Sequence, residues 1–221
     1  MAGTDSHEPL VLQHHFDNLG QQFEASSLGM WLFLVTEILF FGGLFTAYMV
    51  YRMSYPEAFA EASHHLNIAL GGTNTAVLIC SSLTMVMAVY AAQHGDRHKQ
   101  VLFLVLTMVL GLMFLGVKSV EYSHKFAEGL VPGPGSRFEG DAIHAQLFFS
   151  LYFVMTGLHA LHMIIGIGIM AVLAVFAWRG RYTERYHTPV EVSGLYWHFV
   201  DIVWIFLFPL LYLIDRHGAG G

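Results

Sequence analysis

Two carboxyl groups stand inside the most apolar parts of this 221-residue chain. Glu37 and Asp201 each occupy a stretch with no other charge, and His198 precedes Asp201 by three residues. A charge in hydrocarbon costs at least ~2.5 kcal/mol on insertion scales, so each needs a role as a proton-active group, a partner contact or a helix-locking hydrogen bond. Residues three apart share a helix face, which favours a His198–Asp201 locking pair. For Glu37, flanked by Phe40 and Phe41, the proton-active and locking roles stay open.

A second candidate pair is Lys118 and Glu121, which are also three residues apart. Both lie near the end of an apolar stretch, where a lysine stem can extend along the helix and place its ammonium in the interface. The spacing predicts a structural ion pair.

Histidine is abundant, with 14 copies, but most fall in polar segments. Those inside apolar stretches are His159, His162 and His198. His159 and His162 differ by only ~4.5 Å in helical rise, too little to serve two stacked haems. One haem held by His198 and a histidine of the fourth stretch stays open as an alternative. The single cysteine, Cys80, excludes an internal disulfide, an iron–sulfur cluster and a cysteine-rich zinc site.

The composition indicates which elements must position these residues. Hydrophobic residues make up 55% of the chain and charged residues 12%, about half the charged fraction of a soluble domain. The net charge of −6, with scattered Lys and Arg, offers no basic face for nucleic acid. The chain is therefore predicted to be an all-α integral membrane protein.

Five apolar stretches are long enough to cross hydrocarbon as helices. They cover residues 28–51, 67–92, 100–121, 142–178 and 192–214. The fourth would be ~55 Å long and contains no proline, so we expect one long helix that protrudes, or one preceded by a short interfacial piece. The prediction is a single domain, 28–214, forming a bundle of five transmembrane helices between polar tails at 1–27 and 215–221. The segment 131–135 (VPGPG) is predicted to be a turn.

Five spans place the two termini on opposite sides of the membrane. Lys and Arg divide evenly between the two sides. Those on the N-terminal side, such as Arg97, Lys99 and Arg179, sit in short loops, where the positive-inside rule is most reliable. This favours a cytoplasmic N-terminus.

Four segments form a recognisable set: residues 28–41 (LGMWLFLVTEILFF), Lys118 with Glu121-Tyr122, residues 156–162 (TGLHALH) and residues 196–204 (YWHFVDIVW). Together they resemble the third-subunit family of haem–copper oxidases, in its short five-helix bacterial form. The resemblance runs in order from about residue 28 to 214, and its last motif is the most specific.

The resemblance implies a non-catalytic subunit of a cytochrome c oxidase complex, in the bacterial inner membrane. It implies no cofactor or metal in this chain, with haem and copper in partner subunits I and II. Binding of phospholipid, support of assembly and of proton uptake, and membership of a larger respiratory supercomplex are further expectations. Because the first helix pair of longer family members is missing, another subunit would have to complete the family's lipid cleft.

The resemblance also assigns residues. Glu37 falls on the family's carbodiimide-reactive intramembrane carboxyl. Packing, lipid or subunit contacts are expected at Lys118, Glu121, His159, His162, Glu191, Trp197, His198 and Asp201. Glu37→Gln is expected to leave assembly intact, whereas Asp201→Leu is expected to harm assembly by leaving His198 unpaired.

Alternative functions remain at this point. The nearest is the equivalent subunit of a quinol oxidase or a homologue associated with nitric-oxide reductase. An independent b-type cytochrome would carry stoichiometric haem in the isolated chain. A small transporter or proton channel would conduct protons in proteoliposomes of this chain alone, which we do not expect.

Overall fold

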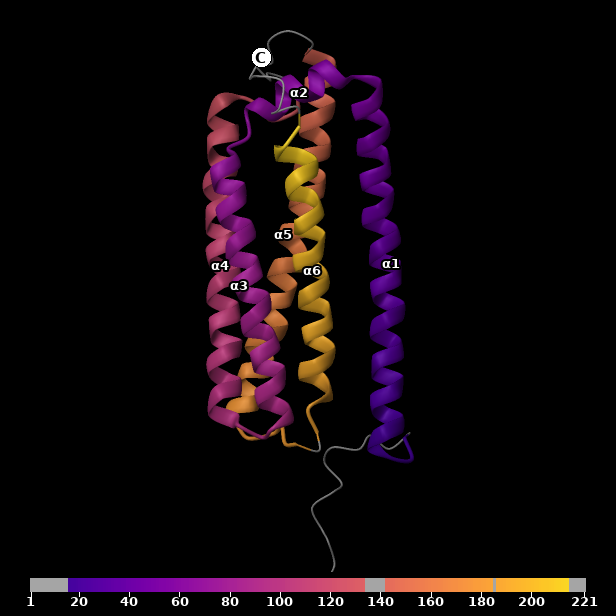
Figure 1. Cartoon of the computed structure of the whole chain (residues 1–221), viewed down its shortest axis with the longest axis vertical. Helices are drawn as coiled ribbons and strands as arrows, with labels where there is room; N and C mark the ends of the chain where they lie inside the picture. Colours follow the sequence, from indigo (N-terminus) through magenta and orange to yellow (C-terminus); the bar gives the residue numbers. More distant parts are fainter. Residues whose placement is uncertain (1–15, 134–141, 185, 215–221) are drawn as a thin grey trace, which may run out of the picture.

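The computed structural model describes residues 16–133, 142–184 and 186–214. These residues form six helices and no named strand. The helices are α1 (Leu19–Ser54), α2 (Pro56–His64), α3 (Ile68–Gln93), α4 (Arg97–Glu128), α5 (Ala142–Trp178) and α6 (Thr188–Tyr212). Figure 1 shows the long helices side by side, with the chain direction alternating from each to the next.

Five of the described helices are long and apolar enough to cross a membrane: α1, α3, α4, α5 and α6. This confirms the predicted all-α, five-span architecture. The short helix α2 was not expected. Pro56 occupies its first turn, where a missing N–H costs nothing, and α2 lies at one end of the bundle between α1 and α3.

Some helices are longer than the predicted apolar spans, because polar capping residues start the helix before the apolar stretch begins. The α1 helix begins at Leu19, well before residue 28, because the Asn18 side chain accepts a hydrogen bond from the Gln21 N–H. Asp96 caps α4 in the same way, and the side-chain hydrogen bond from Lys99 lowers the pKa of Asp96.

At its other end α4 continues to Glu128, beyond the predicted limit at residue 121, and stops at Gly129 in a left-handed conformation (φ 73°). The α5 helix is one continuous helix over residues 142–178, as the first of the two alternatives predicted. In the predicted turn at 131–135, residues 131–133 are not helical, and 134–135 lie outside the described residues.

The four helices α3–α6 pack as one body, and α1 attaches to its side (Figure 1). Trp197 on α6 is fully buried, and its ring would lie 2.9 Å from a Cβ added at either Gly111 or Gly166. In α6, 56% of the most apolar window is buried, against 11% in α1. On α1, Tyr48 is fully buried and its hydroxyl donates to the Leu210 carbonyl of α6 at 2.6 Å.

Candidate functional site

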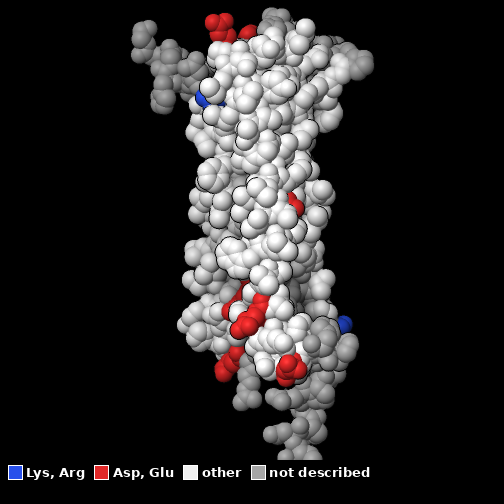
Figure 2. All heavy atoms as spheres, turned by 90° about the vertical axis from the view of Figure 1, so that its right-hand side faces the viewer, with Lys and Arg blue, Asp and Glu red and all other residues white. Residues whose placement is uncertain are grey.

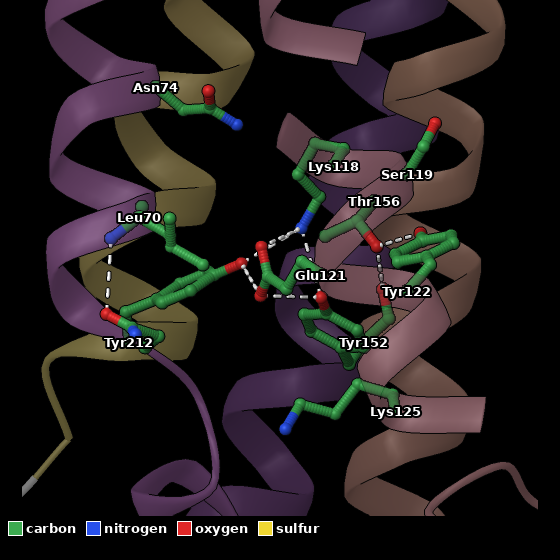
Figure 3. Close-up of polar contacts among 12 residues, drawn as sticks. Leu70, Asn74, Lys118, Ser119, Glu121, Tyr122, Lys125, Tyr152, Thr156 and Tyr212 are labelled. Atoms are coloured by element: carbon green, nitrogen blue, oxygen red, sulfur yellow. Dashed lines mark hydrogen bonds and ion pairs between the residues drawn. The ribbon is translucent and has the colours of Figure 1, made fainter. Parts of the chain in front are cut away.

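A closed polar cluster joins α4, α5 and α6 (Figure 3). The Lys118 ammonium donates to Glu121 Oε2 at 3.1 Å, to the Tyr152 hydroxyl at 3.0 Å and to the Tyr212 hydroxyl at 2.9 Å. Both tyrosine hydroxyls in turn donate to Glu121 Oε1, at 2.9 and 2.5 Å. The predicted Lys118–Glu121 ion pair is therefore present, within a network of two further side chains.

The position of Lys118 near a span end suggested that its side chain would extend to the membrane interface. The structure shows instead that Lys118 stays inside the bundle. Its side chain is 5% exposed and that of Glu121 3%. The ammonium lies 5.0–5.6 Å from the centres of four rings, those of Tyr122, Tyr152, Trp204 and Tyr212. The aromatic faces and the carboxylate hold the charge inside the bundle, so extension toward water is not needed.

This cluster, which we call the lysine cage (Lys118, Glu121, Tyr152 and Tyr212), uses all three N–H donors of the lysine. A fully satisfied ion pair has no capacity for a ligand, so the cage acts by binding three helices together. Sequence reasoning missed Tyr152 and Tyr212. The signal was available, because a tyrosine in an apolar helix needs a partner for its hydroxyl.

A second acid–base pair joins α1 and α5. Glu37 Oε2 lies 3.2 Å from His162 Nε2, and their side chains are 19% and 13% exposed. The contact lacks hydrogen-bond geometry, because Glu37 Oε2 makes no hydrogen bond within the described chain. His162 Nδ1 faces the Leu158 carbonyl at 2.8 Å, and the ring packs edge-on against Phe41.

The surroundings of this second pair are apolar. Figure 2 views the molecule from the α1 side and shows charged groups gathered near the two ends, with only a small acidic spot at mid-height. Ring contacts of Phe33 with Tyr196 and of Phe41 with Phe199 align α1 with α6. They place Glu37 and Asp201 within about one helical turn in depth, consistent with the expected similar depth.

The predicted His198–Asp201 pair is wrong. His198 Nδ1 instead lies 2.7 Å from the Ser82 hydroxyl of α3. Asp201 is 3% exposed, and the same Ser82 hydroxyl lies close enough to interact with its carboxyl, although neither carboxyl oxygen has a partner with full hydrogen-bond geometry within the described residues. A shared helix face therefore did not produce a contact, because the neighbouring helix offered the imidazole a hydroxyl partner.

The remaining predicted residues lie in three separate places. His159 is buried between Phe114 and Trp204, with Nε2 3.1 Å from the Val200 carbonyl. The Trp197 indole donates to the Ser81 hydroxyl at 3.0 Å. Glu191, in the first turn of α6, accepts from Gln93 Nε2 at 2.5 Å and lies 3.3 Å from His187 Nε2.

The intramembrane histidines do not form a common ligand set. His159, His162 and His198 each use a ring nitrogen in a contact with α6, α5 or α3 respectively. Within the described part of the chain, no group of three or more His, Cys, Asp or Glu side chains could hold a metal ion.

Two grooves meet at Leu195 and His198 on α6. The first, between α1 and α6, has a volume of about 500 Å³ and is lined almost wholly by apolar atoms, with Gly42 on its wall. The second, about 410 Å³, continues between α1, α3 and α6 toward Gln93 and Glu191. Together they form an apolar channel with a polar end near the start of α6.

Comparison with known proteins places these features in a family. The model of the family cytochrome c oxidase subunit III matches residues 12–215. The cytochrome c oxidase subunit 3 of Synechocystis is 37% identical over 190 residues, 84% of this chain and 74% of that protein. The corresponding protein of Corynebacterium diphtheriae is 34% identical over 86% of this chain and 88% of its own length.

A relative named as a quinol oxidase subunit matches an even larger share of the chain. The probable quinol oxidase subunit 3 of Staphylococcus haemolyticus is 30% identical over 206 residues, 92% of this chain and 96% of that protein. The match of the family model spans the five membrane helices and the polar groups described above. The chain belongs to the cytochrome c oxidase subunit III family.

Proposed function

We propose that this chain is the accessory, non-redox third subunit of a proton-pumping cytochrome c oxidase in the bacterial inner membrane. It packs beside subunits I and II, whose haem and copper reduce oxygen, and it supports their assembly and sustained proton uptake. The N-terminus is cytoplasmic and the C-terminus periplasmic. A larger respiratory supercomplex could contain the same assembly.

The observation that carries this proposal is the way the intramembrane polar groups are used. The lysine cage, His159 and His198 bond to other helices of the same chain. Each of these histidines uses one ring nitrogen in such a contact, and contacts of this kind favour a helix-packing role. Within this chain the polar groups therefore serve architecture, whereas the redox chemistry belongs to the partners.

The groove between α1 and α6 supports the lipid-binding part of the proposal. Its apolar lining suits an acyl chain, and its continuation toward Gln93 and Glu191 leads to the polar end where a headgroup would lie. We therefore assign one phospholipid to this groove, with its headgroup on the N-terminal side.

Depletion of this subunit from the purified native complex tests the accessory role. The initial rate of oxygen consumption should remain, and activity should then decay faster during turnover than in the intact complex. In a fully assembled complex, Glu37→Gln should also retain the initial rate, because the amide keeps the volume of the carboxyl. Loss of oxygen consumption from the first turnover would contradict an accessory role.

A pair of glycine variants tests the lipid site. A Cβ at Gly42 or at Gly43 would meet no atom within 4 Å, but only Gly42 lines the groove. Gly42→Leu should therefore reduce the phospholipid that remains bound in native mass spectrometry of the complex, whereas Gly43→Leu should not. Equal lipid retention by both variants would argue against this groove as the site.

The electron donor has a second candidate. The relative from Staphylococcus haemolyticus, named as a quinol oxidase subunit, matches nearly the whole chain, which favours a quinol oxidase as the alternative complex. Purification of the native assembly, a haem spectrum and assays with reduced cytochrome c and with a quinol distinguish the two. Activity with quinol alone would select the alternative.

A further inference from the structure

The carboxyl of Asp201 is a buried acid that neither the lysine cage nor the Glu37–His162 pair uses. Only 3% of the residue is exposed, and both carboxyl oxygens are enclosed without a partner of full hydrogen-bond geometry in the described chain. An ionised carboxylate in such a place has lost its water and gained no cation, which is a costly arrangement. A neutral carboxyl, which still carries its proton, avoids that cost.

The basic groups of the neighbouring helices are engaged elsewhere. His159 of α5 faces the Val200 carbonyl through Nε2, and Lys118 of α4 donates all three N–H groups within the lysine cage. Within the described residues, the side-chain group that interacts with the Asp201 carboxyl is the Ser82 hydroxyl of α3. The local partner of Asp201 is therefore uncharged.

Helix geometry brings this carboxyl and this hydroxyl together. Asp201 lies one turn after His198 on the same face of α6, and helical side chains tilt toward the N-terminus of their helix. The Asp201 side chain therefore returns toward the level of His198, whose Nδ1 lies 2.7 Å from Ser82 Oγ. The last torsion of an aspartate side chain is broad, so a small rotation of the carboxyl directs its O–H at Ser82 Oγ.

We propose that Asp201 is a neutral acid that sets the tautomer of His198 through Ser82. The Asp201 O–H donates to Ser82 Oγ, and the Ser82 O–H donates to His198 Nδ1. The neutral imidazole then carries its proton on Nε2. Asp201 is thus a positioning residue, because it acts on His198 without touching it. This inference goes beyond the proposed function, since it does not depend on which oxidase complex contains the chain.

The two grooves that meet on α6 select this direction of donation. His198 lines both grooves, and because Nδ1 contacts Ser82, Nε2 is the ring nitrogen left to face them. In the proposed direction the unpaired hydrogen is on Nε2, where an oxygen of water or lipid in the groove can accept it. In the opposite direction the unpaired hydrogen would be that of Asp201, whose oxygens are enclosed. An enclosed donor without an acceptor is the more costly of the two.

Infrared spectroscopy of the purified native complex tests the protonation of Asp201. Aspartate labelled with ¹³C in its carboxyl separates aspartate bands from glutamate bands. The difference between wild type and Asp201→Asn should contain the band of a protonated aspartic acid. Ser82→Ala should shift that band to higher frequency, because the acid loses its acceptor.

The matched control for this shift is Ser81→Ala. The neighbouring Ser81 hydroxyl accepts from the Trp197 indole, so its loss should leave the Asp201 band in place. A carboxylate band assigned to Asp201 overturns the proposal. Identical Asp201 bands in Ser82→Ala and wild type overturn it as well.

Solid-state ¹⁵N spectra of the histidine-labelled complex in lipid test the positioning role. The signals of His198 are those that disappear in His198→Gln, and in wild type they should show a proton on Nε2 and none on Nδ1. Asp201→Asn should keep this tautomer, because the amide N–H still donates to Ser82 Oγ. Asp201→Leu should change the ratio of the two tautomers about tenfold, as expected for the loss of one hydrogen bond.

This second measurement separates positioning from packing. If Asp201 only filled space, Asp201→Leu would leave the His198 tautomer as it is in wild type, and that result overturns the proposal. A proton on Nδ1 of His198 in the wild-type complex overturns it too.

Discussion

The lysine cage and the Glu37–His162 pair are two solutions to the same problem, an acid beside a base in hydrocarbon. In the lysine cage the paired side chains are 5% and 3% exposed, and both partners are fully bonded. In the other pair the exposures are 13% and 19%, and Glu37 Oε2 is left without a hydrogen bond in the described chain. The first pair joins three helices of the body through a closed set of hydrogen bonds, whereas the second joins only α1 and α5, through a single 3.2 Å contact.

The difference follows from the helices that carry the two pairs. Lys118 and Glu121 face inward from α4 between α5 and α6, so three helices supply partners. Glu37 lies on α1, whose most apolar window is only 11% buried. Because α1 packs against the α3–α6 body on one side only, the neighbouring helices supply partners for Glu37 from that side alone.

The largest effect on stability is expected from breaking the Lys118–Glu121 ion pair of the lysine cage. Glu121→Leu leaves the Lys118 ammonium uncompensated and should destabilise the folded chain by ~3–5 kcal/mol. The double variant Lys118→Met/Glu121→Leu should recover most of that loss, because no charge remains buried. Thermal unfolding in detergent measures both, and a stable Glu121→Leu protein would contradict the comparison.

A smaller effect is expected from the backbone contacts around Trp197. A Cβ at Gly166 would lie 2.9 Å from the indole ring, whereas one at Gly168 meets nothing within 4 Å. Gly166→Ala should therefore cost ~1–3 kcal/mol through overpacking, and Gly168→Ala should be close to neutral. The unfolding midpoints of the two variants provide the test, with equal values counting against tight packing of the body.

The attachment of α1 should be more tolerant. Tyr48→Phe removes the 2.6 Å hydrogen bond to the Leu210 carbonyl while keeping the ring, and should cost ~0.5–1.5 kcal/mol. The loss should appear as faster hydrogen exchange in α1, with α3–α6 unchanged. Faster exchange throughout the bundle would mean that α1 is an integral part of the body.

The smallest effect is expected at Asp201. Because its carboxyl meets only the Ser82 hydroxyl, and without full hydrogen-bond geometry, Asp201→Leu should change stability by less than ~1 kcal/mol or increase it. This reverses the expectation of harm based on a His198–Asp201 pair. Complex yield and unfolding midpoint measure the effect, and a strong loss of either would indicate an additional partner for Asp201.

Hydropathy alone predicted the five spans, because apolar length is a property of the local sequence. It did not predict that the helix α1 begins at Leu19, ahead of the apolar stretch, since the Asn18 cap can extend a helix through polar residues. Spacing predicted the Lys118–Glu121 pair correctly, because both residues are on one helix. The same spacing failed for His198 and Asp201, where α3 supplied Ser82 as a competing partner.

The sequence by itself determined which residues must lie in hydrocarbon and which of them are polar. Only the tertiary structure decided their partners, such as Tyr152 and Tyr212 for Lys118, or His162 for Glu37. The physical reason is that helix formation follows from nearby residues, whereas a buried polar group bonds to the donor or acceptor that helix packing brings within about 3 Å.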